Sequence, residues 1–503
     1  MIPDGILRIG NEAFFHCSLT SIVIPDGVQR IGDWAFSDSG LTSIAIPYSV
    51  NTIGNSLFSY CDNLVSVTIP DWVTSIGSFA FAHCDNLEEL TIGNSVATIG
   101  DYAFSDCSLL TEVTIGNSVH SIGNNAFEDC LSLTSITMPY SVFTIGYQAF
   151  YGCRSLTELK IGESVEIIGK EAFYQCAKLT SVTIPGAVTA IGDGAFYDCD
   201  KLASVTILYS TKTIGNSAFE DCGSLTSVAI PNSVTSIGSD AFKSCGKLTS
   251  IVIPNSVTSI GNGAFYHCYS LSSLVIHDSV KTIGEEAFYQ CSGLTSVVLP
   301  NSVTSIGNRA FSYCSKLTSI VISNSLTSIG NSAFYYCNKL ASIVIPSSVT
   351  SIGSSAFSEC AALKDVTVSW ARPLLIKTLY DDPFRNVNLS NRTLHVPAGT
   401  RDLYANAFVW EDFGVILETT GGDGGNGDSV EAVNSNEAEV TLAAGILTVT
   451  STATEQVVIY STSGALLHKT TKSTGTAAIN ISHIPKGILI VAGGSGWRKK
   501  LNN

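Results

Sequence analysis

Hydrophobic and small polar residues alternate in a fixed order that recurs along most of the chain. In residues 248–270 a Leu-x-x-Ile-x-Ile segment begins at Leu248 and predicts a short strand with one buried face. Pro254 follows, and it predicts a turn at the strand's end because proline has no N–H to donate to a sheet. Val257 and Ile260 then point back toward the interior.

The second half of the unit predicts a short helical turn. Gly261 permits a sharp bend, and Asn262 is a suitable N-cap residue. Ala264, Phe265 and Cys268 follow at a spacing of one and three, as on one face of a helix. One such α/β unit cannot bury its apolar edge alone, so the pattern predicts a stack of copies, that is, a solenoid.

The Ile-Gly pair marks the register of the repeat. It occurs in 16 units, from Ile9 to Ile352, with a period of 22 residues at first and 23 from Ile53 onward. The residue after this glycine is Asn, Asp or Ser in 13 of the 16 units. This regularity predicts a short side chain that accepts the same hydrogen bond in every unit, and we interpret that bond as a helix N-cap.

Composition and charge narrow the function classes. The formal charge of −16 argues against nucleic acid, which needs a basic surface. No run approaches 18 apolar residues, so the sequence predicts no membrane-spanning helix. The 45% hydrophobic content instead fits a stack in which most of each coil is interior.

The fifteen cysteines follow the repeat rather than a disulfide framework. Cys17 comes first, and a row then runs every 23 residues from Cys61 to Cys360. Residues at one place in successive coils lie about 4.8 Å apart with parallel Cβ vectors, which fits a disulfide poorly. We predict buried free thiols, and a straight row does not offer four converging zinc ligands.

The complete motif, Leu-x-x-Ile-x-Ile-Pro-x-Ser-Val-x-x-Ile-Gly-x-x-Ala-Phe-x-x-Cys, resembles the BspA-like class of bacterial leucine-rich repeats over residues 1 to about 368. The resemblance implies a curved right-handed solenoid with a parallel sheet on its concave side. It also implies a cell-surface protein that binds host matrix or plasma proteins, or other bacteria.

The ends of the chain differ from the array. The first residues match the middle of a unit and contain no signal peptide, so we expect a truncated N-terminus. Residues 369–418 lose the rhythm and are rich in aromatic residues, among them Trp370, Tyr404 and Trp410, which predicts a C-terminal capping module. Residues 419–429 are a Gly/Asp linker by composition.

Residues 430–503 contain short alternating segments and predict a small all-β sandwich. The runs 458–464 and 479–488, and the basic residues 498–500, are similar to the C-terminal sorting domain of the type IX secretion system. That resemblance implies export to the outer surface of a Gram-negative bacterium by the type IX machinery. It also implies O-glycosylation at Asp-Ser-apolar sites, for which Ser429 is a candidate.

We find no candidate for catalysis or a cofactor. His16, His83 and His267 each precede a cysteine, but adjacent residues project in different directions and the three units are several coils apart. The paired acids Glu128-Asp129 and Glu285-Glu286 have no visible partner, and we interpret them as a solvated face. The sequence therefore predicts a protein that is not an enzyme.

The outward positions of the strands form the candidate binding face. Most coils carry Thr and Ser there, as in Thr249, Ser250, Thr295 and Ser296, which suits strands and also offers repeated hydroxyls. The uniformity is broken between coils 4 and 7 by clustered charge, namely Glu88, Glu89, Glu112, Glu158 and Lys160. A protein or glycan ligand and a purely solvated sheet both remain open as interpretations of this face.

A row of tyrosines follows the core Phe: Tyr151, Tyr174, Tyr197, Tyr266, Tyr289 and Tyr335. We interpret it as ridge packing, with stacking on a carbohydrate or partner as the alternative. The leading functional hypothesis is an adhesin-type binding scaffold, and the alternative is a purely structural surface spacer.

Overall fold

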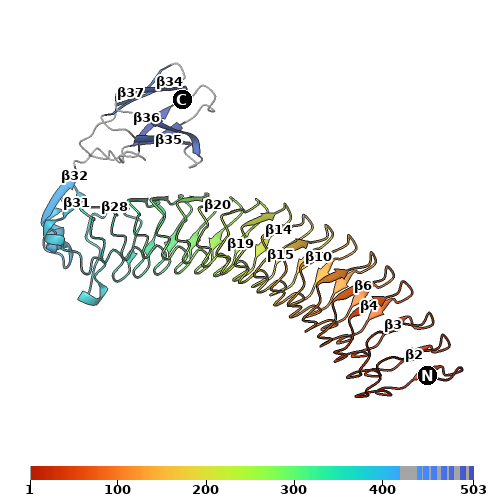
Figure 1. The fold of residues 1–503 in the computed structure, drawn as a ribbon. Coiled ribbons are helices and arrows are strands. Elements are labelled where there is room, and N and C mark those ends of the chain that lie inside the picture. The colour runs from red at the N-terminus through yellow and green to blue at the C-terminus, as the bar shows by residue number, and fades with distance from the viewer. Residues whose placement is uncertain are drawn as a thin grey trace.

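The structure, a computed structural model, describes residues 2–419 and the strands between residues 439 and 502. Residues 2–419 form a curved stack of similar coils with the N-terminus at one end (Figure 1). Each coil contributes one short strand to a first row, and from residue 66 onward each coil also contributes one longer strand to a second row. All strand pairs within the two rows are parallel.

The first row consists of two-residue strands that end at the Ile of the Ile-Gly pair. Its members are β1 (Arg8–Ile9), β2 (Arg30–Ile31), β3 (Thr52–Ile53), β5 (Ser75–Ile76), β7 (Thr98–Ile99), β9 (Ser121–Ile122), β11 (Thr144–Ile145), β13 (Ile167–Ile168), β15 (Ala190–Ile191), β17 (Thr213–Ile214), β19 (Ser236–Ile237), β21 (Ser259–Ile260), β23 (Thr282–Ile283), β25 (Ser305–Ile306), β27 (Ser328–Ile329) and β29 (Ser351–Ile352). From β3 to β29 they form one continuous sheet of 14 strands.

The second row is formed by the Leu-x-x-Ile-x-Ile segments. Its members are β4 (Ser66–Ile69), β6 (Glu89–Ile92), β8 (Glu112–Thr114), β10 (Ser135–Thr137), β12 (Glu158–Lys160), β14 (Ser181–Ile184), β16 (Ser204–Ile207), β18 (Ser227–Ala229), β20 (Ser250–Ile253), β22 (Ser273–Ile276), β24 (Ser296–Val298), β26 (Ser319–Val321), β28 (Ser342–Ile345) and β30 (Asp365–Val368). Buried and exposed residues alternate along these strands, as the sequence predicts. The row is divided into several smaller sheets.

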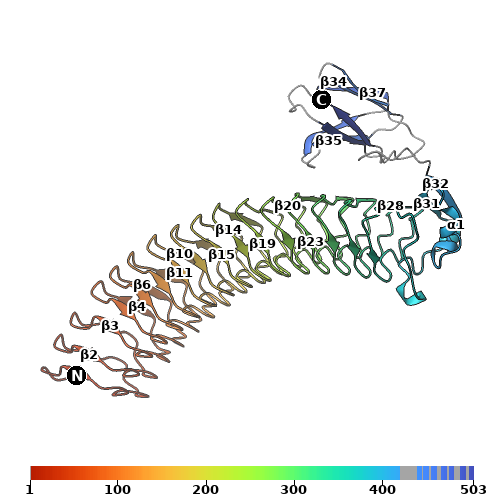
Figure 2. The same ribbon diagram turned by 180° about the vertical axis from the view of Figure 1, so that it is seen from behind.

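The second row does not line the concave side, contrary to the expectation from the resemblance. In both views, β10 and β20 lie toward the outer side of the bend, and β15 and β19 of the first row lie nearer its inner side (Figures 1 and 2). Coils in a curved stack are closest on the inner side, which agrees with an unbroken sheet there and an interrupted one outside. The candidate binding face is therefore an outer flank of the solenoid.

The predicted helical turn is also wrong, because residues 262–267 form turns that bond to the neighbouring coil. The N–H groups of Gly263, Phe265 and His267 donate to carbonyl oxygens of the next coil at 2.8–2.9 Å. Gly263 and His267 have φ angles of 60° and 59°, which an α-helix cannot contain. The array is thus a strand-and-turn solenoid rather than an α/β one.

The residue after the Ile-Gly pair links coils instead of capping a helix. The Oδ1 atom of Asn262 accepts a hydrogen bond of 2.9 Å from the backbone N–H of Glu285, one coil further on. Asn308 and Asn331 repeat the bond with the residues that follow them by 23. The preference for a short acceptor is therefore real, but its partner is the next coil.

Glycine at the Ile-Gly corner is needed for close approach between coils. A Cβ atom on Gly261 would lie 2.5 Å from the carbonyl carbon and oxygen of Gly238 in the preceding coil. Gly10, in the first coil, has nothing within 4 Å of the same position. The interior behind this corner is a column of phenylalanine rings, with centroids 5.2–5.7 Å apart.

The last coils are closed by an aromatic module. It contains η1 (Leu379–Asp381), η2 (Leu389–Asn391), β31 (Thr393–Pro397), α1 (Arg401–Tyr404), η3 (Trp410–Asp412) and β32 (Val415–Thr419). β31 and β32 continue the second row beyond β30. Phe384 stacks on Phe357 at 5.5 Å and is met edge-on by Trp410.

Trp370, Tyr404 and Trp410 are buried core residues of this module, as predicted. The Tyr404 hydroxyl donates to the Trp370 carbonyl at 2.8 Å, and the two indole N–H groups donate to backbone carbonyls.

The C-terminal segment contains only strands in its described parts. They are β33 (Glu439–Ala443), β34 (Ile446–Ser451), β35 (Glu455–Ser461), β36 (Leu466–Lys472), β37 (Gly475–Asn480), β38 (Ile488–Gly493) and β39 (Arg498–Asn502). They form two antiparallel sheets, in the orders β33-β34-β37 and β36-β35-β38-β39. These strands agree with an all-β segment, and their packing into a sandwich stays a prediction. Ser429 and most of the linker lie outside the described residues.

Candidate functional site

The charged residues of the predicted face are exposed on three strands of the second row. Glu89 of β6 and Glu112 of β8 are direct partners in neighbouring strands, and both side chains face solvent. Glu88 precedes β6 and is exposed as well. The structure thus brings Glu88, Glu89 and Glu112 together on adjacent coils.

Glu158 and Lys160 lie farther along the same face. They belong to β12, whose strand partner β10 presents Ser135 and Thr137 opposite them. One coil with no charge at these positions therefore separates Glu158 from Glu112. Among the described residues, neither Glu158 nor Lys160 takes part in an ion pair.

The threonines of this face form hydrogen bonds between neighbouring coils. Thr249 is exposed, yet its hydroxyl donates to the carbonyl of Thr226 in the preceding coil at 3.3 Å. Thr295 accepts the same kind of bond from Thr318, at 2.9 Å. The serines that follow, Ser250 and Ser296, are exposed and stand in register with the serines of neighbouring strands.

The cysteine row consists of buried free thiols, as predicted. All fifteen cysteines are free, and only Cys17 is partly accessible. The Cys107 thiol donates to the carbonyl of Phe81 at 3.2 Å, and most of the others repeat this bond. Burial raises the pKa of the Cys107 thiol to about 12, so these groups stay protonated at neutral pH. A nucleophilic cysteine would need the opposite environment.

The three histidines do not form a Cys-His pair. His16, His83 and His267 have positive φ angles on the turns, and each lies beside an acidic or aromatic residue of the neighbouring coil. Within the described part of the chain, no group of three or more His, Cys, Asp or Glu side chains is placed to hold a metal ion. No helix in those residues is long and apolar enough to cross a membrane.

One candidate surface was only partly foreseen from the sequence. Tyr151, Tyr174 and Tyr197 stack in an unbroken series, with centroids 4.8 and 4.6 Å apart. The stacking agrees with the predicted ridge packing. The polar rows beside them occupy the two left-handed positions of each turn. These polar rows are hard to recognise in the sequence, because Asn, Gln, Glu, Asp, Ser and Gly all occur at the left-handed positions.

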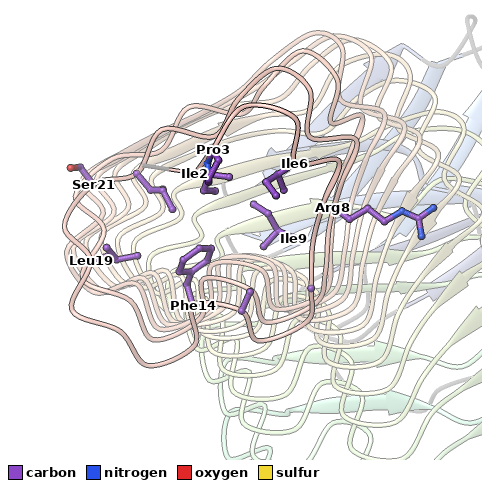
Figure 3. Close-up of a pocket in the computed structure, with 11 residues that line it drawn as sticks. Ile2, Pro3, Ile6, Arg8, Ile9, Phe14, Leu19 and Ser21 are labelled. Carbon is purple, nitrogen blue, oxygen red and sulfur yellow. The ribbon is translucent and has the colours of Figure 1, made fainter.

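The open end of the first coil forms an apolar hollow of about 370 Å³. Ile2, Ile9, Phe14 and Leu19 point into it, and Arg8 points away (Figure 3). These are core positions of the repeat: Ile2 and Ile9 are buried, and Phe14 and Leu19, which no coil of this chain covers, are only half-buried. The hollow is therefore an end of the stack rather than a site with its own chemistry.

A stack of parallel strands with one turn motif per coil, built on the Leu-x-x-Ile-x-Ile pattern, defines a leucine-rich repeat solenoid. The family described as BspA type leucine rich repeat region, six copies, matches residues 1–111, 98–223, 166–295, 212–338 and 281–412. The chain therefore belongs to the BspA-type leucine-rich repeat family.

The chain is also similar to solved structures. The chain is 29% identical to a leucine-rich repeat protein from Bacteroides ovatus, over 69% of this chain and 87% of that one, with a TM-score of 0.50. A leucine rich cell surface protein from Faecalibacterium prausnitzii is 26% identical, over 76% of this chain and 86% of that one, with a TM-score of 0.31. No curated protein matches the chain.

Proposed function

We propose that this chain is a secreted or cell-surface binding protein, an adhesin-type scaffold that holds host or bacterial proteins or glycans and performs no catalysis. The family supplies the class, because leucine-rich repeat proteins serve as binding scaffolds. The array can present a binding surface to a partner, because side chains on successive strands stand in fixed register. Rigid surfaces lose little entropy on binding.

The observation that carries the proposal is the paired exposure of Glu89 and Glu112. Like charges directly opposite each other on neighbouring strands cost about a few tenths of a kcal/mol. No lysine or arginine lies within ion-pair distance of either carboxylate in residues 2–419. A basic partner would relieve this repulsion, and its association should weaken with salt.

A binding panel of immobilised matrix proteins, plasma proteins and glycans tests the scaffold directly. Once a partner is found, Glu88, Glu89, Glu112 and Glu158 are replaced together by glutamine. The matched control replaces four exposed glutamates elsewhere: Glu12, Glu163, Glu166 and Glu285. We expect slower association and a smaller salt dependence for the first variant only. Equal behaviour of both variants would show that this patch is only solvated sheet.

A structural surface spacer is the second candidate. It is supported by the threonine row, whose hydroxyls bond to the preceding coil and so serve the stack. The uniform Thr and Ser positions would then have no ligand at all. A spacer should bind nothing in the panel, which separates the two proposals.

Localisation follows as part of the same proposal. The resemblance of residues 430–503 to a type IX sorting domain supports export to the surface of a Gram-negative bacterium, and the antiparallel strands there are compatible with it. The test expresses the chain with an export leader in a type IX host, with and without residues 430–503. Loss of surface protein on deletion is expected, and equal amounts would contradict the proposal. In the exported protein, an unshifted mass of the peptide that contains Ser429 would exclude the glycan.

A further inference from the structure

A stripe of tyrosines crosses the turns of three consecutive coils. Tyr151, Tyr174 and Tyr197 each follow the core Phe, and their rings are nearly parallel, at 10° and 1°. All three side chains are half-buried, so their edges remain accessible. Burial raises the pKa of each phenol, and nearby carboxylates add to the effect. We call these three residues the tyrosine stripe.

Polar side chains at the left-handed positions border the stripe on both sides. On one side, Asn125 donates to Gln148 at 2.9 Å, and Gln148 donates to Glu171. On the other side, Gln175 donates to Asp198 at 3.2 Å. These bonds run from coil to coil, so they fix the carboxylates beside the aromatic edges.

The borders of the stripe carry more negative than positive charge. Asp129, Asp198 and Asp221 occupy one left-handed position in their coils. Within residues 2–419, none of the three has a lysine or arginine within ion-pair distance. Glu171 is the exception, because Lys170 lies 3.4 Å from it. Arg154 is a further cation there, and its Nη2 donates to Gln175 at 3.4 Å. The carboxylates of Asp129, Glu171, Asp198 and Asp221 still outnumber Lys170 and Arg154.

Farther along the same row, the chain supplies its own cations. Lys243 stands where other coils have tyrosine, and its Nζ lies 2.7 Å from Glu220 and 5.9 Å from the Tyr266 ring centroid. Arg309, at a left-handed position of another coil, lies 3.0 Å from Glu286. The Lys243 contacts show how a basic side chain is held here, between a carboxylate and an aromatic ring.

We propose that the tyrosine stripe and its bordering aspartates are the docking surface for an arginine- and lysine-rich segment of a partner protein. The proposal rests on the binding role proposed above and assigns a second surface to it. Charge complementarity favours a basic segment over a neutral glycan. The internal Lys243 contacts supply the geometry that such a segment would repeat coil by coil, and the Arg309–Glu286 pair shows that an arginine is also held by a turn carboxylate.

The test uses the full chain and a fluorescein-labelled peptide of alternating arginine and glycine, followed by fluorescence anisotropy at low and high salt. The stripe variant is D198N/D221N, since asparagine tolerates the left-handed conformation of both positions. The control is E163Q/E166Q, which removes equal charge from exposed positions elsewhere. We expect roughly five- to tenfold weaker binding for the stripe variant, as for the loss of two exposed ion pairs, and little change for the control.

A second variant separates the aromatic contribution from charge. Tyr174→Leu keeps the charge of the border but removes the middle ring, and it should also weaken binding and lower the preference for arginine over a lysine-glycine peptide. Equal losses for D198N/D221N and its control would overturn the proposal. If the quadruple glutamine variant of Glu88, Glu89, Glu112 and Glu158 alone abolished binding, the proposed function would stand and the stripe would not. Unchanged binding in every variant would reject both surfaces.

Discussion

Replacing Gly261 with alanine should break the contact between two coils at a single point. The new Cβ would lie 2.5 Å from the Gly238 carbonyl and 2.7 Å from the Ser239 nitrogen, whereas ordinary contacts are at 3.4 Å or more. The coils must therefore separate by about 1 Å at the corner. The Gly261 N–H donates to the Ile237 carbonyl at 3.2 Å, and this bond would lengthen beyond a useful distance.

The expected cost is about 3 kcal/mol, the upper range for overpacking against a backbone that cannot yield. For a cooperative array of about 370 residues this lowers Tm by roughly 4 °C, given an unfolding entropy of about 2 cal/mol/K per residue. Thermal unfolding followed by circular dichroism measures the shift.

The same substitution at Gly10 provides the matched control. In this chain Gly10 has no preceding coil, and nothing lies within 4 Å of the added atom. Gly10→Ala should therefore leave Tm nearly unchanged. If both variants lost the same stability, the glycine requirement would come from backbone conformation within one coil, and the close-approach explanation would be refuted.

Three further predictions concern the thiols, the Asn row and the acidic turns. A thiol reagent should label about one site, Cys17, in the native protein and all 15 after denaturation without reductant, and a lower denatured count would reveal disulfides. Asn262→Ala should cost about 1 kcal/mol in chemical denaturation because the Glu285 N–H loses its acceptor, and Asn262→Asp should retain most of that stability. Burial raises the pKa of Asp129, so the carboxyl group binds its proton more tightly in the folded protein than in the unfolded chain. The resulting stabilisation is fully present at low pH and is lost as the pH rises through the folded-state pKa. Asp129→Asn should therefore raise Tm at pH 7 relative to wild type but not at pH 3, and an equal effect at both pH values would contradict this.

The sequence alone determined the stack, its period and its interior. The Ile-Gly register, the column of Phe side chains and the row of buried thiols all follow from residues that recur every 22 or 23 positions, and the structure confirms them. Burial depends mainly on side-chain chemistry, and chemistry repeats with the sequence. The burial of the aromatic residues in the capping module could also be predicted from the sequence, because large aromatic side chains are stabilised by packing in a core.

Only the tertiary structure decided how the backbone groups are paired and which way the stack bends. Ala264, Phe265 and Cys268 fit a helical turn by spacing, but their coil bonds to its neighbour instead. Asn262 was expected to accept from its own helix and accepts from Glu285. Such partners lie 23 residues away, where local spacing carries no information. The direction of the bend is a property of the whole stack, which no single unit contains, so the resemblance placed the face bearing Glu89 and Glu112 on the wrong side of it.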